Sequence, residues 1–219
     1  MTNVESRLQF VSAFFSWLRE YLGVARRGRR TPIVDSQGLC RFLETRASHV
    51  AQTSLYGYLR TRAGTRYPEL FESDVFVESV NIAKWQMMLA CLSDLAVYAG
   101  GLLAQRWNVP TAQVGEVMEA AVGTVLDSIG TPPDAGEPFA AGVARVRARL
   151  ARTDWRTITD SEAPFCESPA ALVEWAPIVD ELKQRDTEII ENSVRFRWQE
   201  VRRELRRDLD GDALLATVH

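Results

Sequence analysis

The sequence predicts an all-α fold, a single bundle-like domain of about six helices with a long C-terminal helix. Apolar residues recur at helical spacing through most of the chain, and no segment alternates as a strand would. Turn-rich stretches separate the periodic segments. With 219 residues and 46% hydrophobic composition, the chain has the size and composition of one globular domain, which we expect to span residues 1–219.

Residues 1–30 are predicted to form an amphipathic helix followed by a basic segment. Thr2 and Glu5 have capping-box spacing, and apolar residues, many of them aromatic, then recur at helical spacing up to Leu22. Such a helix beside a basic cluster is typical of an interfacial membrane anchor, although its apolar face could equally pack in the core. The candidate anion- or membrane-binding residues are Arg26, Arg27, Arg29 and Arg30.

Three longer helices are predicted next, at about residues 35–63, 74–108 and 111–129. Gly64 is a helix-stop signal after the first of them, and Pro110 ends the second. Thr111 is the expected N-cap of the third, whose apolar residues at i, i+3, i+4 and i+7 form one wide face.

The last third of the chain alternates turns and helices. Residues 131–136 are a turn-rich linker, residues 137–152 a short helix and residues 153–167 an irregular loop. Ser168 and Pro169 have the pattern of an N-cap followed by proline at the first helical position. The C-terminal helix is expected to restart at Pro177 and to reach Asp208, with apolar residues among arginines as in an amphipathic helix that docks on a bundle.

The window Trp85–Ala104 has the length of a membrane span and a single charge, Asp94. An acid at the centre of a span costs roughly 2.5–3.5 kcal/mol, so a buried central helix of the bundle is the better interpretation. A carboxylate there must be paired, hydrogen-bonded or protonated. Asp94 is therefore the buried polar candidate, with a structural role beside an arginine of the helix at 35–63 as the favoured interpretation.

An aromatic-basic patch follows the middle of the helix at 35–63. Tyrosine hydroxyls and guanidinium groups together can hold a phosphate or a carboxylate, whereas basic residues at a helix C-terminus can also merely complement its dipole. The members of the patch are Tyr56, Tyr58, Arg60, Arg62, Arg66 and Tyr67.

Charge and composition exclude several kinds of chemistry. Residues 1–66 carry eleven arginines against four acids, whereas residues 67–180 carry seven bases against sixteen acids. The net charge of −3 argues against a general nucleic-acid coat. With two histidines, His49 and His219, and three cysteines without CxxC spacing, we expect no metal site, no cofactor, three free thiols and a reducing cytoplasm.

The block from Leu55 to Gly101 resembles a family of short all-helical proteins from alphaproteobacteria. The resemblance is carried by Leu-Tyr-Gly-Tyr-Leu-Arg-Thr-Arg from Leu55 and by Ala-Cys-Leu-Ser-Asp-Leu from Ala90. We expect some members of that family to be labelled esterases, which would imply a small hydrolase. The layout is also similar to that of the ubiquinol–cytochrome c chaperone family, although Glu78-Ser-Val-Asn-Ile-Ala stands in place of that family's acidic-Gly-Arg-Phe stretch.

Taken together, these patterns favour a non-enzymatic helical binding or assembly protein. Its expected partner is another protein, with an anionic membrane surface as a second one, so that the chain would be cytoplasmic and peripheral on the inner membrane. The alternative is a small esterase-like hydrolase, which would lack a Gly-x-Ser-x-Gly elbow and would depend on His49 as its base. A helical nucleic-acid-binding protein is third.

Overall fold

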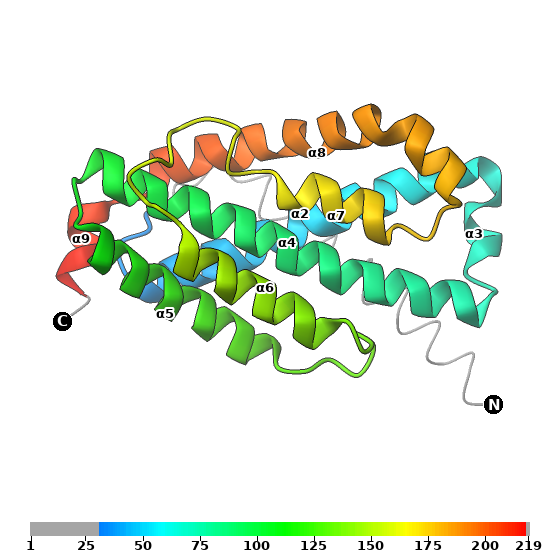
Figure 1. Ribbon diagram of the computed structural model, residues 1–219, viewed down its shortest axis with the longest axis horizontal. Coiled ribbons are helices and arrows are strands. Elements are labelled where there is room, and N and C mark those ends of the chain that lie inside the picture. Colours follow the sequence, from blue (N-terminus) through cyan, green and yellow to red (C-terminus); the bar gives the residue numbers. More distant parts are fainter. Residues whose placement is uncertain (1–30, 218–219) are drawn as a thin grey trace. The chain divides into compact units, whose positions relative to one another are not determined.

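The computed structural model describes residues 31–217. In that part of the chain all the regular secondary structure is helical (Figure 1). Pro32–His219 form one compact unit, to which all the described helices belong. The predicted all-α bundle with a long C-terminal helix is confirmed. The single domain over residues 1–219 and the amphipathic helix within residues 1–30 stay predictions, because residues 1–30 lie outside the described part.

The described helices follow one another with short connections. In chain order they are α2 (Ser36–Ala63), the 3₁₀ turn η1 (Gly64–Arg66), α3 (Tyr67–Leu70), α4 (Asp74–Arg106), α5 (Thr111–Ile129), α6 (Phe139–Arg152), α7 (Glu167–Trp175), α8 (Asp180–Asp208) and α9 (Gly211–Ala216). The linker expected at 131–136 lies in the turn between α5 and α6, and residues 153–166 form an irregular loop before α7.

Local capping explains where the two longest helices begin. The Asp35 side chain accepts a hydrogen bond from the Gly38 N–H at 2.7 Å, at the start of α2. The Ser73 side chain accepts one from the Phe76 N–H at 3.4 Å, at the start of α4. Helix α2 ends at Gly64 with φ of +55°, a conformation that glycine adopts without strain.

Some predicted boundaries were wrong. Thr111 is the first helical residue of α5 and not its N-cap, because the chain before it is held extended at Pro110. The long C-terminal helix starts at Asp180 instead of Pro177, after an irregular segment that separates it from α7. The short elements η1, α3 and α9 were missed, since each is too short to show a helical period.

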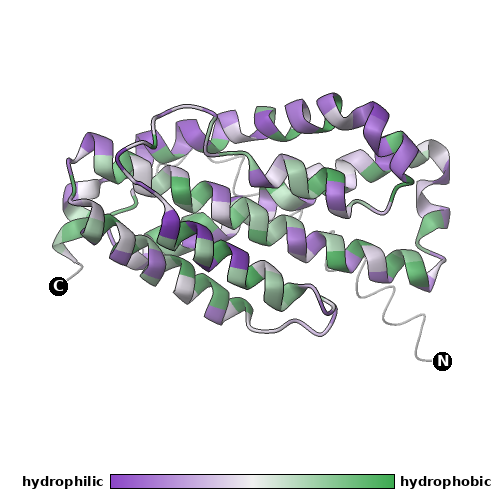
Figure 2. Ribbon diagram, viewed as in Figure 1, coloured by the Kyte–Doolittle hydropathy of each residue, from purple (hydrophilic) through white to green (hydrophobic). Residues whose placement is uncertain are grey.

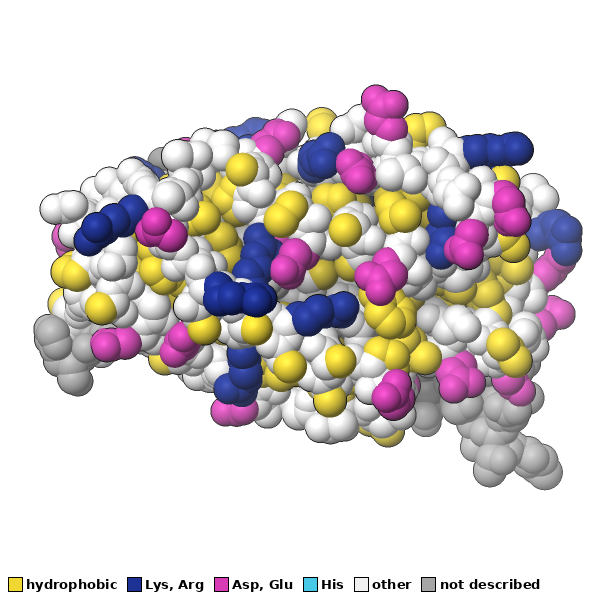
Figure 3. Space-filling view, in the orientation of Figure 1, with side chains coloured by type: hydrophobic (Ala, Val, Ile, Leu, Met, Phe, Trp, Pro, Cys, Tyr) yellow, Lys and Arg dark blue, Asp and Glu magenta, His cyan; other side chains and the backbone are white. Residues whose placement is uncertain are grey.

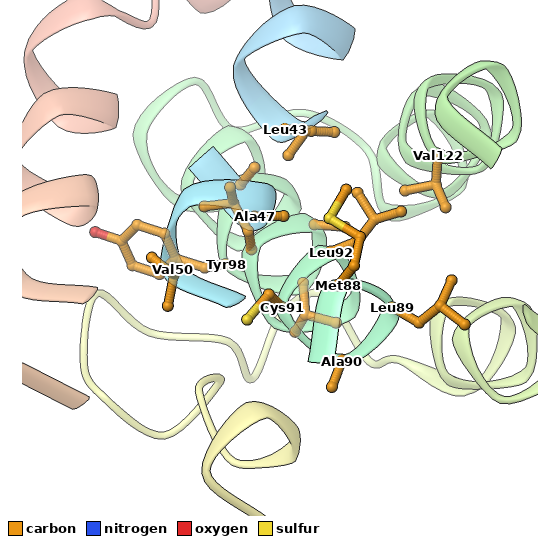
Figure 4. Close-up of a cluster of buried hydrophobic side chains, with 14 of the residues drawn as sticks. Leu43, Ala47, Val50, Met88, Leu89, Ala90, Cys91, Leu92, Tyr98 and Val122 are labelled. Atoms are coloured by element: carbon orange, nitrogen blue, oxygen red, sulfur yellow. The ribbon is translucent and has the colours of Figure 1, made fainter. Parts of the chain in front are cut away.

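Helix α4 is the core of the bundle. It packs against α2, α5, α6 and α7, and every residue from Gln86 to Leu103 is buried. Side chains radiate from α4 toward Leu43 and Val50 of α2 and Val122 of α5 (Figure 4). One helix in the described part, α4, is long and apolar enough to cross a membrane, yet 89% of its most apolar window is buried inside the bundle. The prediction of a buried central helix is confirmed.

The loop at 153–166 packs on α4 where two glycines leave space for it. A Cβ on Gly100 would lie 2.7 Å from Cε3 of Trp155, and one on Gly101 would lie 2.7 Å from Cβ of Ile158. The loop is also held by Asp160, which accepts a 2.6 Å hydrogen bond from the Tyr98 hydroxyl. The loop is therefore a fixed part of the bundle surface.

The last long helix, α8, rests on α2 and α7. Its turns that face the bundle are hydrophobic and its outward turns are mostly hydrophilic (Figure 2). Beyond its end, the backbone N–H of Ile33 donates to Asp208 at 2.7 Å, and the N–H of Asp210 donates to Ile33 at 3.0 Å. This pair of bonds joins the start of the described chain to the end of α8.

Candidate functional site

Asp94 is fully buried in α4 and is paired with Arg149 of α6. Nη1 of Arg149 donates to Oδ1 of Asp94 at 2.6 Å and also lies 3.1 Å from the Ser93 hydroxyl. The arginine partner expected from α2 is thus wrong, since the cation comes from α6. The position of Asp94 at the centre of the apolar helix, which made it a candidate in the sequence, is confirmed as buried.

The same carboxylate caps the N-terminus of α7. The backbone N–H groups of Glu167 and Ser168 donate to its two oxygens at 3.1 and 2.8 Å, and the Ser168 hydroxyl donates at 2.6 Å. Helix N-termini favour anions because their first N–H groups have no partner within the helix. The N-cap residue Cys166 offers no side-chain hydrogen bond, so Asp94 caps α7 from a different helix.

This arrangement corrects the predicted start of α7. Ser168 is the second residue of the helix rather than its N-cap, and Pro169 is the third rather than the first. The Ser168 hydroxyl binds the Asp94 carboxylate instead of its own backbone, and it accepts a 2.9 Å hydrogen bond from the Trp198 indole N–H. A remote cap of this kind leaves no local pattern in the sequence.

Every polar group of this cluster has a partner. Complete burial raises the pKa of Asp94, while the Arg149 charge and the Ser168 hydrogen bonds act in the opposite direction. Nη2 of Arg149 donates to the Pro164 carbonyl at 2.6 Å and lies 3.6 Å from the Cys166 sulfur. Burial also raises the pKa of the adjacent Cys91 thiol well above its ordinary value. The cluster joins α4, α6, α7 and α8, and both oxygens of the Asp94 carboxylate are occupied by partners from the bundle.

The aromatic-basic patch is largely engaged within the protein. Arg62 makes a bidentate ion pair with Asp186 of α8, and the Tyr58 hydroxyl donates to the same carboxylate at 2.9 Å. The Arg62 hydrogen bonds lower the pKa of Asp186. These contacts join α2 to α8, so Tyr58 and Arg62 bind a carboxylate of this chain.

The other members of the patch do not converge on that carboxylate. Arg66 makes a surface ion pair with Glu69 at 3.4 Å, and Arg60 is exposed. Tyr67 packs edge-on against Phe71 with ring centroids 5.2 Å apart. Burial raises the pKa of Tyr56 far above its ordinary value. The remaining candidates, Arg26, Arg27, Arg29 and Arg30, lie outside the described residues.

The outer face of α8 carries two exposed apolar side chains that the sequence did not single out as a pair. Ile189 is 70% exposed and Phe196 is 71% exposed. They are seven residues apart, so they lie on the same face of the helix, away from the buried Ile190, Val194 and Trp198. Two nearby ion pairs, Arg195–Glu191 and Arg203–Glu200, put both signs of charge beside them.

No cluster of three or more metal-binding side chains occurs among residues 31–217. The three cysteines are all free, as the sequence predicts: Cys40 is half-buried, Cys91 buried and Cys166 exposed. Fold and site together define an all-α helical bundle with a buried ion pair between α4 and α6. No family model, curated protein or solved structure matches the chain.

Proposed function

We propose that the chain is a non-enzymatic helical binding protein whose partner, another protein, docks on the outer face of α8. The observation that carries the proposal is the pair Ile189 and Phe196, both about seven-tenths exposed and two helical turns apart. Side chains seven residues apart lie on one face of a helix, where a partner helix that packs alongside can contact both. Exposed aromatic residues are common anchors of protein interfaces.

The charge around this pair supports a protein partner over an anionic membrane. Exposed acids and bases alternate there, as in the pairs Arg195–Glu191 and Arg203–Glu200. A helix face that binds an anionic bilayer is expected to carry basic residues without acidic ones among them. The other exposed large apolar residues of the described chain, Val34, Val75 and Val179, share no helical face with one another.

Two observations support a non-enzymatic role over the hydrolase alternative. Ser168, the one serine among residues 31–217 whose hydroxyl donates to an acid, is completely buried and its hydroxyl is held by Asp94 and Trp198. Burial, together with Arg46 and Arg197, lowers the pKa of His49 to about 4, which makes it a weak general base at neutral pH.

The test compares proteins that co-purify with the tagged chain from its native host. The double substitution Ile189→Ser and Phe196→Ser should reduce the co-purified partner at least tenfold without unfolding the bundle, since both side chains are exposed. Val75→Ser, at a site 74% exposed on α4, is the matched control and should retain the partner. Retention by the double variant contradicts the proposal, and concentration-dependent sedimentation of the pure protein would identify a second copy as the occupant.

Membrane attachment through Arg26, Arg27, Arg29 and Arg30 is a separate proposal that rests on the sequence. Each arginine near an anionic surface adds about 1 kcal/mol, and the attraction falls as salt rises. Co-sedimentation with anionic vesicles should therefore be lost at high salt and on replacement of the four arginines by glutamine. If the wild-type protein does not bind anionic vesicles at low salt, this proposal is wrong, and the proposal of a partner on α8 is not affected.

A further inference from the structure

A groove of about 160 Å³ lies between α4, α6 and α7. Its apolar wall is formed by Leu89, Ala90, Val146 and Ala171. Its polar lining includes Gln86, Arg145, Glu167, Glu174 and Trp175. On the face shown in Figure 3, arginine side chains gather over α6, with acidic side chains beside them toward α7.

Gln86 brings a buried hydrogen-bond donor to this groove. Gln86 is only 1% exposed, and its Oε1 accepts a 2.8 Å hydrogen bond from Nη2 of Arg145. A guanidinium can only donate, so Arg145 fixes the amide oxygen on its side and leaves Nε2 on the other. That nitrogen is buried and has no hydrogen-bond partner within the described chain.

Trp175, at the end of α7, brings a second donor of the same kind. Its indole Nε1 is also buried and unpartnered among the described residues. Buried N–H groups are almost always satisfied in folded proteins, because leaving one unsatisfied costs about 1–3 kcal/mol. Two such donors on one groove call for an acceptor that the described chain does not supply.

The size and lining of the groove suit a small organic group better than water. The space is about five times the 30 Å³ that one water molecule occupies in the liquid, and most of its wall is apolar. The groove is also smaller than the roughly 300–1,000 Å³ of drug-sized ligand pockets, so it fits a group of a few heavy atoms.

The charges at the rim select a neutral acceptor. Glu167 is paired with Arg149 at 3.2 Å, which leaves Arg145 and Glu174 as opposite charges at the mouth. Because these two charges cancel, an anion gains no net attraction at the mouth, whereas a primary amide offers its oxygen to the donors and its N–H₂ to the Glu174 carboxylate. We propose that the groove between α4, α6 and α7 binds a small carboxamide, either a free amide or the side chain of asparagine or glutamine. This site is independent of the α8 surface.

The test follows the indole N–H resonance of Trp175 by NMR while propionamide is added to the whole chain. The resonance, assigned by its loss in Trp175→Phe, should shift saturably, with a dissociation constant of roughly 1–10 mM for so small a ligand. Propionate and propylammonium, which match its shape but carry charge, should cause at least tenfold weaker effects. The indole resonance of Trp198, already bonded to Ser168, should not move.

Gln86→Glu is the informative variant, because it keeps the shape and the contact with Arg145 but replaces the N–H₂ donor with a carboxylate. Propionamide binding should weaken at least tenfold. Gln199→Glu, an identical change at an exposed position on α8, is the matched control and should bind as wild type. If Gln86→Glu does not fold, Trp175→Phe gives the same information through the Gln86 side-chain N–H₂ resonances, which should then respond several-fold less to the ligand.

Three outcomes would overturn the proposal. One is a Trp175 resonance that does not respond to propionamide up to about 100 mM, which would mean that water satisfies the donors. Another is an equal response to propionate, which would assign the groove to anions, and the third is unchanged binding in Gln86→Glu. Peptides Ac-Gly-Gln-Gly-NHCH₃ and Ac-Gly-Glu-Gly-NHCH₃, whose ends carry no primary amide, separate the sources. Tighter binding of the glutamine peptide than of propionamide indicates a protein side chain, and weaker binding indicates a free amide.

Discussion

The two ends of α7 lie against the same central helix but differ in how their polar groups are satisfied. At the N-terminal end, Asp94 accepts the first two backbone N–H groups, the Ser168 hydroxyl and the Arg149 guanidinium. At the C-terminal end, the Trp175 indole and the nearby Gln86 amide each have a buried N–H with no partner in the described chain. Trp175 as a whole is partly exposed, unlike Asp94 and Ser168, but its Nε1 and the Gln86 Nε2 are buried atoms, so the difference lies in whether the bundle supplies acceptors.

The difference separates a structural polar cluster from a candidate binding site. A buried charge that is fully paired fixes the helices around it and has no capacity left for a ligand. A buried donor without an acceptor retains that capacity. Buried titratable groups with a shifted pKa are often taken as signs of function. In this bundle the group with the shifted pKa, Asp94, has all its partners within the protein, whereas the uncharged N–H donors of Gln86 and Trp175 have none in the described chain.

The largest expected effect is at the satisfied end. Asp94→Ala should destabilise the protein by about 3–5 kcal/mol, because it leaves the Arg149 charge buried without its partner and uncaps α7. Urea unfolding at neutral pH measures the loss. A loss under about 0.5 kcal/mol would mean that the carboxylate is exposed in solution. The double variant Asp94→Leu with Arg149→Met should lose less than the sum of its parts, since it removes both charges together.

A glycine pair tests how closely the groove end is packed. A Cβ on Gly142 would lie 2.7 Å from Cδ1 of Leu89 and 3.0 Å from Oε1 of Gln86, so Gly142→Ala should cost about 1–2 kcal/mol despite its better helix propensity. Gly123, within α5, has nothing within 4 Å of such a Cβ. Gly123→Ala should therefore stabilise by about 0.5–1 kcal/mol. Thermal unfolding compares the two, and equal effects would contradict close packing at Gly142.

The same chemical change at two tryptophans separates the ends directly. Trp198→Phe removes the donor to Ser168 and should cost about 1–3 kcal/mol, whereas Trp175→Phe removes an unsatisfied buried N–H and should be neutral or stabilising by up to about 1–3 kcal/mol. Chemical denaturation followed by circular dichroism measures both. A larger loss for Trp175→Phe would show that its indole N–H already has an acceptor.

The smallest effect is a difference in thiol reactivity that costs no stability. In the native protein Cys166 is exposed and should react first with a disulfide reagent, while Cys91, buried beside Asp94, should react only as fast as the bundle opens. The denatured, non-reduced protein should show three thiols. A count of one would reveal a disulfide, and fast labelling of native Cys91 would show that the N-terminal end of α7 is loose.

The fold could be predicted from the sequence because its helices are long and periodic. The central position of α4 follows from its continuous apolar composition, and the ends of α2 and α4 follow from Asp35, Ser73 and Gly64. The prediction was wrong at the start of α7, because a contact with a distant residue caps the helix there instead of a residue next to it in the sequence. Ser168 precedes a proline as N-caps do, but its hydroxyl is held by Asp94, 74 residues earlier in the chain.

The candidate sites were less predictable for the same reason. Asp94 could be found as the one acid in an apolar helix, but nothing local to Arg149 or Trp198 marked them as its neighbours. Gln86 and Trp175 come from different helices, and their shared feature is a missing hydrogen bond, which no sequence pattern records. Tyr58 and Arg62 were among six patch residues that the sequence assigned to a phosphate or a carboxylate, and only the structure shows that these two bind Asp186.

The backbone hydrogen bonds between Ile33 and residues Asp208 and Asp210 can form only after α8 has been synthesised, so this part of the fold closes late in translation. The ribosome releases Ile33 and α2 long before it has made the residues on which they close. Until α8 emerges, the side of α2 that it covers stays open to water, and a chain stalled before residue 180 would present that apolar surface to other chains. Truncations that remove α8 should therefore aggregate, because they leave that side of α2 uncovered.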